Sequence, residues 1–261
     1  MNRILYEQNE VSDGVATFGG VRAEHVANIL HAEPGGRIKS GVVDGPVGTS
    51  LLLEVSPQRV VARVEHDRVS IRPWADVILA PPRPRAFKRL LPQLAALGAR
   101  NIFLVGAAKV EKDFWGATIL EEKNFRPLLI DGLMQSGASI LPAIHLRRNF
   151  RKFINEELDS LVPPGVARIV AHPYAACVER ASCPLPGTDA CVERSSRPSP
   201  ENQTNRSTSA GVCFAIGPEG GWTDGEVETL ESRSFERYSL GARILKTETA
   251  AIALLARFMA V

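Results

Sequence analysis

The chain has 261 residues, enough for one large domain or two modest ones with a buried core. Its 44% apolar and 23% charged residues are ordinary for a soluble globular protein. The net charge of +2 excludes a strongly basic field, so any nucleic acid would have to bind to local basic patches. No run approaches the roughly 20 apolar residues of a membrane span, and the N-terminus lacks a signal-peptide pattern. We therefore expect a cytoplasmic protein without a membrane partner.

Four cysteines stand at positions 177, 183, 191 and 213, and no two of them form a C-x-x-C pair. This spacing argues against a zinc site and against a disulfide framework, as expected in a reducing cytosol. We therefore expect no bound metal. Cys213 lies in an apolar stretch, where a small buried core residue is the natural interpretation.

Residues 1 to about 72 are predicted to form short strands separated by glycine-rich turns. Gly35-Gly36 precedes the strand candidate 37–43, and Asp44–Gly48 precedes the candidate 51–55. One short helix is expected between Ala23 and Leu30. This rhythm is typical of a small β-barrel.

The pattern changes after residue 72. Val77–Ala80 is a short apolar strand candidate, and the prolines in 81–84 prevent a helix before Arg85. A helix is predicted from there to about Leu97, ending at Gly98, and the strand candidate Ile102–Val105 follows. Strand, helix and strand in this order indicate a parallel sheet. A helix at about 119–136 and strands at 169–171 and 212–216 would complete an α/β domain over residues 73–261.

Residues 177–210 fit neither domain. They are rich in Ser, Pro, Thr, Asn and charged residues and show almost no apolar periodicity. We interpret this stretch as a disordered surface insertion, because so long a structureless segment is unusual inside a compact domain.

Gly217-Pro-Glu-Gly-Gly221 follows the last strand candidate and precedes a helix that Thr223 or Asp224 could cap. Its glycines allow positive φ angles and close approach of the backbone to a ligand. The loop lacks the lysine of a phosphate-binding loop and the spacing of a dinucleotide site. Taken alone, it would be explained equally well as a tight turn between a strand and a helix.

A second glycine loop, Ser239–Leu245, follows some 20 residues later. It leads into a helix for which Thr247 is the expected N-cap, with Glu248 placed favourably against the helix dipole. From Thr249 to Met259 this helix is apolar on nearly all sides, with Arg257 as its one charged residue. Such a helix is buried in a core or in an interface.

Together the loops read G-P-E-G-G and L-G-A-R-I-L-K-T-E-T-A, with Lys246 in the second basic position. They closely resemble the RsmE family of SPOUT-class methyltransferases, which methylate N3 of a uridine in small-subunit ribosomal RNA. The resemblance extends more weakly over most of the chain. It includes the opening Met1–Ile4, the helix bearing His25, the turn at Pro34–Arg37, Leu97-Gly98 and Ala171–Pro173.

This resemblance implies a PUA-like N-terminal barrel for RNA, followed by an α/β domain with a deep trefoil knot. It implies a homodimer, for which the apolar helix 249–259 is suited, and it implies S-adenosylmethionine (SAM) as cofactor. The residues expected to hold SAM come from the two loops and their flanks: Ala215, Ile216, Gly217, Gly220, Gly221, Ser239, Leu240, Gly241, Ile244, Leu245 and Thr249.

Methyl transfer to a ring nitrogen needs no cysteine nucleophile, but it needs alignment of the reactants and loss of the imino proton. Arg243 is our candidate for stabilising the uridine anion, and Glu219 our candidate for orienting the base or removing the proton. Each has a structural alternative. Arg243 could pair with Glu248, and Glu219 could brace the amides of its own loop.

RNA binding needs positive charge near the phosphates. Basic residues cluster over 83–89 and again over 147–152, and either cluster could also be only a solvated face. The candidates for contact with ribosomal RNA are Arg83, Arg85, Lys88, Arg147 and Arg148. Neither His25 nor His172 stands in a spacing of potential ligands typical of a metal site, and both are interpreted as structural.

Three stretches depart from the family pattern. Ile29-Leu-His31 replaces a basic V-L-R, Leu94–Gly98 replaces a T-E-L-G turn, and Met134–Ala138 replaces E-Q-S-x-R. These changes leave the two loops intact but concern the side expected to face RNA. A different RNA site, or a paralogue that binds SAM or RNA without turnover, therefore stays open.

Overall fold

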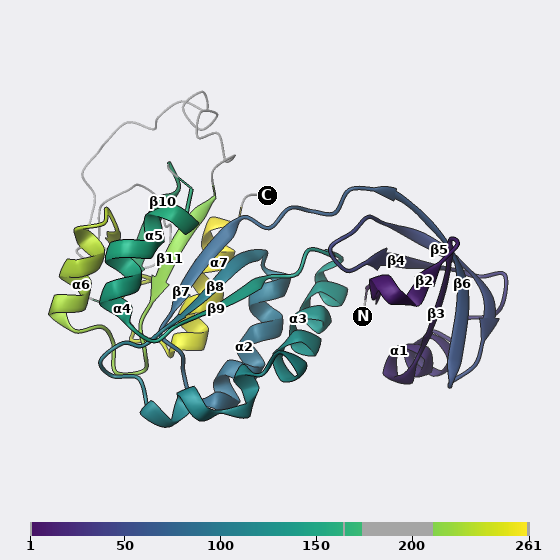
Figure 1. Cartoon of the computed structure of the whole chain (residues 1–261), viewed down its shortest axis with the longest axis horizontal. Helices are drawn as coiled ribbons and strands as arrows, with labels where there is room; N and C mark the ends of the chain where they lie inside the picture. Colours follow the sequence, from purple (N-terminus) through teal and green to yellow (C-terminus); the bar gives the residue numbers. More distant parts are fainter. Residues whose placement is uncertain (1, 164, 174–210, 260–261) are drawn as a thin grey trace, which may run out of the picture.

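The computed structural model describes residues 2–163, 165–173 and 211–259, which form two lobes (Figure 1). Each lobe is built on one six-stranded sheet. The insertion predicted at 177–210 lies outside the described residues. We propose that the domain boundary near residue 72 falls in the connection between residues 68 and 75, which joins the two sheets. Within the described part, no helix is both long and apolar enough to cross a bilayer.

The N-terminal lobe is a curled sheet with the strand order β1-β4-β5-β6-β3-β2, in which only β1 and β4 pair in parallel. Tyr6, Phe18 and Leu52 lie in its core. The barrel-like form is as predicted, but the helix begins three residues earlier than expected, at Gly20, and ends in a π turn. The elements are β1 (Ile4–Tyr6), η1 (Gln8–Glu10), β2 (Val11–Ser12), β3 (Val15–Gly19), α1 (Gly20–Glu24), η2 (His25–Ile29), β4 (Arg37–Val42), β5 (Val47–Val55) and β6 (Arg59–Arg68).

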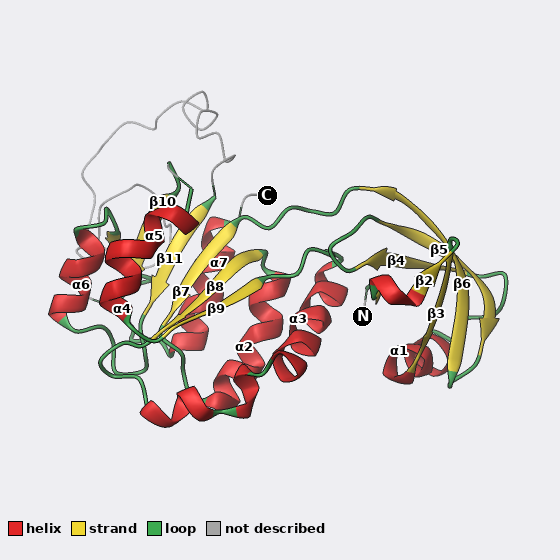
Figure 2. Cartoon of the chain, viewed as in Figure 1, coloured by secondary structure: helices red, strands yellow, loops and turns green. Residues whose placement is uncertain are grey.

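The second lobe is a parallel sheet with the strand order β12-β10-β11-β7-β8-β9 and helices on both faces (Figure 2). On one face lie α2 (Pro84–Ala96), α3 (Glu122–Ser136) and α7 (Thr247–Phe258). On the other lie α4 (Phe150–Lys152), η5 (Phe153–Glu157), α5 (Leu158–Leu161) and α6 (Asp224–Glu231). The strands are β7 (Ala75–Leu79), β8 (Ala99–Val105), β9 (Ala143–Arg147), β10 (Ala167–Ala171), β11 (Val212–Ile216) and β12 (Glu236–Tyr238), and two 3-10 turns, η3 (Lys112–Gly116) and η4 (Thr118–Leu120), precede α3.

Both faces of this sheet are covered, which explains the continuous apolar runs of its strands. Successive side chains of a strand point to opposite faces. Val77 and Leu79 accordingly pack toward α2 and α7, whereas Ile78 packs toward α4 and α6. In β11 Phe214 joins the first core and Cys213 the second.

Proline and glycine set the ends and the spacing of the first two helices. Pro84 is the first residue of α2, one position before the predicted start, where its missing N–H costs no helical hydrogen bond. α3 begins at Glu122, after two 3-10 turns, rather than near 119. A side chain at Gly132 would approach the Pro92 carbonyl oxygen to 2.0 Å, so glycine is what lets α2 and α3 pack this closely.

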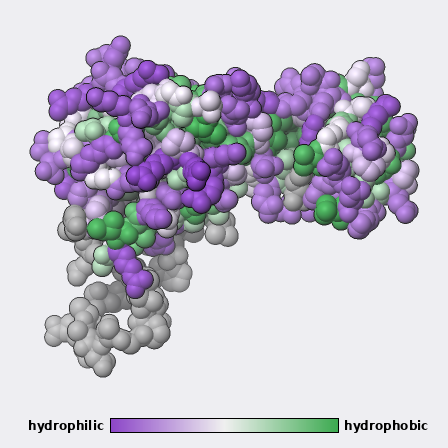
Figure 3. Space-filling view, turned by 90° about the horizontal axis from the view of Figure 1, so that it is seen from below, coloured by the Kyte–Doolittle hydropathy of each residue, from purple (hydrophilic) through white to green (hydrophobic). Residues whose placement is uncertain are grey.

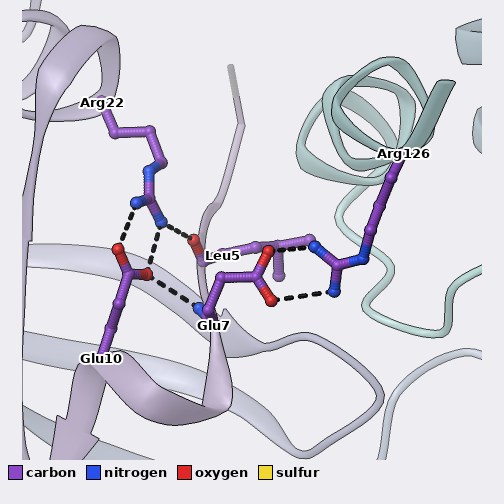
Figure 4. A network of polar contacts seen from close by, with 5 residues as sticks. All are labelled: Leu5, Glu7, Glu10, Arg22 and Arg126. Atoms are coloured by element: carbon purple, nitrogen blue, oxygen red, sulfur yellow. Dashed lines mark hydrogen bonds and ion pairs between the residues drawn. The ribbon is translucent and has the colours of Figure 1, made fainter. Parts of the chain in front are cut away.

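One ion pair joins the two lobes, and a second lies beside it within the N-terminal lobe (Figure 4). Arg126 of α3 donates two hydrogen bonds to the carboxylate of Glu7, while Glu10 accepts from Arg22 within the N-terminal lobe. Hydrogen bonding to Arg126 holds the pKa of Glu7 below its usual range. The pair therefore stabilises the junction at neutral pH, and this contribution is lost as the pH falls through that lowered pKa.

The stretch 134–138, which departs from the family pattern, lies at this same junction. The backbone amides of Asn2 and Arg3 both donate to the Met134 carbonyl, and Arg3 Nε donates to the Gly137 carbonyl at 2.9 Å. These contacts use backbone carbonyls, so the stretch takes part in holding the lobes together through its backbone.

A buried carboxylate, Asp76, lies near the start of β7. Its side chain is fully buried and accepts hydrogen bonds from Arg100 Nε at 3.0 Å and Asn101 Nδ2 at 2.8 Å. Because an unpaired buried charge is costly, Arg100 is needed wherever Asp76 is ionised.

We expect Arg100→Met to lower the free energy of unfolding by about 3 kcal/mol, because it leaves the Asp76 carboxylate without its cation. The matched control is Arg37→Met. Arg37 pairs with Glu65 on the surface, where both side chains are more than a third exposed, so the cost there should be under about 1 kcal/mol. Urea denaturation measures both, and equal losses would contradict the special role of the buried pair.

Candidate functional site

The loops singled out in the sequence lie together at one edge of the parallel sheet. Because all its strands run in the same direction, the segments after β7, β8, β10, β11 and β12 leave at their carboxyl ends. Open parallel α/β sheets bind ligands at this edge. We therefore take it as the candidate site.

The first loop, 217–221, makes a tight turn in which the Gly221 amide donates to the Pro218 carbonyl at 2.8 Å. Gly221 has a φ of +69°, and nothing lies within 4 Å of the place a side chain would take. At Gly217 a side chain would come within 3.2 Å of the backbone nitrogen of Trp222, a tighter contact than side chains usually make. The backbone is thus open to a ligand at one glycine and tightly packed at the other.

The buried carboxylate of Glu226 fixes the start of α6. Of the two N-cap candidates, Thr223 and Asp224, the structure selects Thr223, and Glu226 completes a capping box with it. The same carboxylate accepts a hydrogen bond from the amide of Ala108 at 2.7 Å, and Lys109 Nζ donates to the Gly220 carbonyl at 2.8 Å. The segment after β8 is therefore held against the first loop.

The second loop, 239–245, is exposed from Gly241 onward. Gly241 has a φ of +122° with open space beside it, and its amide donates to the Ser239 hydroxyl at 3.2 Å. Ile244 beside it is 76% exposed, and Leu245 is also exposed. Apolar side chains displayed next to open backbone are suited to cover a flat, partly apolar ligand.

Thr247 joins the two loops. Its buried hydroxyl donates a hydrogen bond to the Gly217 carbonyl at 3.0 Å. The sequence-based assignment of Thr247 as N-cap was wrong, because the N-cap is Lys246 and Thr247 is the first helical residue. Its hydroxyl is thereby free to reach across to the first loop.

Two buried polar atoms beside these loops have no hydrogen-bond partner among the described residues. They are Nε1 of Trp222, which follows the first loop, and Oε2 of Glu248, which follows the second. A buried donor or acceptor left unpaired is costly, and a bound ligand is one way to satisfy it. One donor and one acceptor at the junction of the loops therefore fit a polar small molecule such as SAM.

Both candidate catalytic residues are exposed at this edge. Glu219 lies 3.9 Å from Arg83 and, within the described part of the chain, accepts no hydrogen bond from the amides of its own loop. Arg243 forms no ion pair with Glu248 or with any other described residue. Neither structural alternative is present, and the guanidinium of Arg243 is left available to a substrate.

The remaining predicted cofactor residues lie at the carboxyl end of β11, in the second loop and at the start of α7. Ala215 and Ile216 are buried in β11, so they can offer only backbone groups. Leu240 is half-buried against the core formed with α7, and Thr249 is exposed on the first turn of α7.

The predicted RNA-binding residues differ in what surrounds them. Arg85 and Lys88 are exposed on α2. Arg83 is exposed but pairs with Glu111 at 3.1 Å, and Arg147 pairs with Glu157 at 2.7 Å. Arg148 instead lies over an aromatic ring, Trp115. Of these five, Arg83 and Arg147 are already neutralised.

Sequence reasoning missed Lys109 and Trp222 at this site. Lys109 follows β8, and only the packing of β8 beside β7 and β11 brings it to the first loop. The one available signal was the three-residue spacing of Thr223 and Glu226, which is typical of a capping box but does not reveal the contact of Glu226 with Ala108. Among the described residues, no group of three or more His, Cys, Asp or Glu could hold a metal ion.

This arrangement defines an α/β domain with a composite ligand site made of two adjoining glycine loops. Residues 71–259 match the model of the RNA methyltransferase domain family, and the chain belongs to this family.

Curated relatives cover nearly the whole chain. One from Treponema pallidum, named ribosomal RNA small subunit methyltransferase E, is 26% identical over 97% of this chain and 88% of its own length. One from Borreliella burgdorferi, named ribosomal RNA small subunit methyltransferase E 1, is 22% identical over 97% of this chain and 95% of its own.

Solved structures share the fold. The Neisseria gonorrhoeae ribosomal RNA small subunit methyltransferase E, bound to S-adenosyl methionine, has a TM-score of 0.69 at 20% identity and covers 98% of this chain and 96% of its own. A putative methyltransferase from Legionella pneumophila, in complex with SAM, gives the same TM-score and coverage at 20% identity. The predicted architecture, a parallel-sheet α/β domain preceded by a barrel-like sheet, is confirmed. The SPOUT-type trefoil knot stays a prediction from the resemblance.

We expect Cys213→Ala to retain methyl-transfer activity. Cys213 is fully buried, and burial raises the pKa of its thiol, so no thiolate is available at neutral pH. Alanine keeps a small apolar side chain in the core and should cost little stability. Transfer of a radiolabelled methyl group to RNA measures the outcome. Loss of transfer in a folded variant would contradict a cysteine-free mechanism.

Proposed function

We propose that the protein transfers a methyl group from SAM to N3 of a uridine in small-subunit (16S) ribosomal RNA. The observation that carries the proposal is the Thr247–Gly217 hydrogen bond, which joins the two loops of the motif into one site. Membership of the RNA methyltransferase domain family, the names of the curated relatives and the SAM-bound solved structures support it.

SAM supplies a methyl group on a sulfonium sulfur, a leaving group that needs no activation by the protein. The backbone of 215–221 and 239–245 would hold it, with Ile244 and Leu245 covering its apolar surface. Trp222 Nε1 can donate to its polar groups, and Glu248 Oε2 can accept from them. The protein contributes alignment and the exclusion of water.

At the acceptor, the chain must stabilise negative charge as the uridine loses its imino proton. Arg243 is exposed on the second loop, and its cation is free of acidic partners among the described residues. A preorganised cation at the position where charge develops is an effective means of catalysis. Glu219, held only loosely by Arg83, is the candidate for orienting the base or accepting its proton.

RNA and a second copy of the chain are the proposed partners. Arg85 and Lys88, which form no ion pair with another described residue, offer exposed charge to phosphates. α7 buries Ala251, Leu254 and Leu255 against its own lobe, and Met259, directly after the helix, is exposed. The exposed side of α7 together with Met259 is the proposed contact with a second copy.

Mass spectrometry of ribosomal RNA nucleosides from a deletion strain tests the function. We expect N3-methyluridine to be missing from small-subunit RNA and to return on complementation. Loss of a different methylated nucleoside would move the activity to another site or atom. An unchanged nucleoside profile would contradict the proposal.

We expect Gly241→Val to abolish SAM binding in calorimetry, because valine fits poorly at a φ of +122° and its side chain would enter the open space of the second loop. The matched control is Gly14→Val, at a φ of +75° with equally open space in the N-terminal lobe. It should carry a similar strain and keep wild-type affinity. SAM binding by Gly241→Val would show that the cofactor lies elsewhere.

We expect Arg243→Ala to lower kcat about 100-fold, the usual effect of removing one group that stabilises developing charge. The Kd for SAM should change little, since the backbone holds the cofactor. Steady-state kinetics with calorimetry separates the two effects. A parallel loss in both quantities would assign Arg243 to cofactor binding instead.

A further inference from the structure

An aromatic side chain and a cation stand together in the segments that follow β8 and β9. Trp115, in the 3-10 turn η3, is only half-buried. The guanidinium carbon of Arg148 lies 5.6 Å from the centre of its ring, and Arg148 Nη2 donates to the Trp115 carbonyl at 3.3 Å. This is the geometry of a cation–π pair, with Arg148 exposed to solvent.

The pair is held rigidly by the fold. The buried ring of Phe114 meets Trp115 edge-on at 5.7 Å and packs in turn against Phe87 of α2. The Arg148 carbonyl oxygen occupies the space beside Gly106, only 2.0 Å from where a side chain would begin. Because the pair is preorganised, little conformational entropy would be lost when a ligand stacks on it.

The charge of Arg148 is also uncompensated. Arg83 and Arg147 at the same edge each pair with a glutamate, whereas Arg148 has no acidic partner within the described residues. Figure 3, which views the molecule from below, shows a largely hydrophilic surface with small apolar patches. A partly buried indole that backs the exposed guanidinium of Arg148 thus offers a stacking surface and a phosphate contact at one point.

The position of the pair relative to the two glycine loops defines what it can bind. β9 is three strands from β11 in the sheet, so their carboxyl ends are about 14 Å apart at the usual strand spacing. That is too far for the acceptor base but within reach of a nearby nucleotide of the same strand. Lys109 and Ala108, which contact the first loop and α6, anchor the segment that carries Trp115.

We propose that Trp115 and Arg148 form a stacking platform for an unpaired base of the RNA strand that flanks the methylated nucleotide. The proposal rests on the proposed function, since it assigns a second contact to the same RNA. Stacking on aromatic rings and guanidinium planes is how proteins hold single-stranded RNA, and a base in a duplex cannot offer its face. The platform therefore selects an unpaired stretch of the substrate.

The test uses the full chain with a short oligouridine and an RNA duplex of equal length as probes. Because loss of one stacked base costs about 1–3 kcal/mol, we expect Trp115→Ala to weaken oligouridine binding about tenfold or more. Trp115→Phe, which keeps a ring, should stay within about threefold of wild type. Arg148→Ala should weaken binding, whereas Arg147→Ala, its neighbour already paired with Glu157, is the matched control. Duplex binding should change little in the two Trp115 variants, because a base in a duplex cannot stack on the ring.

Calorimetry with SAM distinguishes this proposal from the proposed function. Every variant should bind SAM as the wild type does, which also shows that it is folded. Wild-type oligouridine affinity in Trp115→Ala, or equal losses in Trp115→Phe and Trp115→Ala, would overturn the platform. A wild type that binds SAM but no oligouridine would overturn it as well. A wild type that binds no SAM would instead overturn the proposed function.

Tryptophan fluorescence gives a second readout. Trp222 is buried, and Trp74 packs against Phe214 at the opposite end of the sheet. Oligouridine should therefore quench the emission of the wild type and leave that of Trp115→Phe unchanged. Equal quenching in both proteins would contradict stacking on Trp115.

Discussion

The hydrogen bond from the Thr247 hydroxyl to the Gly217 carbonyl is the contact on which the candidate site depends. It joins loops that leave different strands, and it is buried, so its loss would leave a polar group unsatisfied. Gly217 packs closely against Trp222, where a side chain would come within about 3.2 Å. Each loop also has one glycine with open space beside it, Gly221 in the first and Gly241 in the second. A site of this kind is shaped by backbone, and side chains mainly hold the backbone in place.

The parallel sheet supplies the frame for this contact. With both faces covered by helices, its strands are fixed in register, and their carboxyl ends bring five separate segments to one edge. Glu226 and Lys109 extend the frame by tying the segment after β8 to the first loop. Hydrogen bonds therefore connect the candidate cofactor region directly to the segment that leads to the proposed RNA surface.

Many strands, helix starts and caps could be predicted from the sequence, because short-range features such as apolar runs, capping residues and prolines determine them. The strand 212–216, the capping by Thr223 and the start of α2 beside Pro84 follow from apolar runs, caps and prolines. The short strands β9 and β12 were missed because sheet neighbours, rather than their own sequences, determine them. The role of Thr247 was missed because a threonine before a helix resembles an N-cap, and only tertiary contact shows its other partner. The Trp115–Arg148 pair joins residues 33 positions apart, beyond any local pattern.

The attachment of the first residues has a practical consequence. Asn2 and Arg3 use their own backbone amides to hold the end of α3, and Arg3 also bonds to Ser40 and Gly48 carbonyls in the N-terminal lobe. Residues 2 and 3 thus connect the two lobes by hydrogen bonds. Any change to these first residues would have to keep both backbone hydrogen bonds for the two lobes to stay docked.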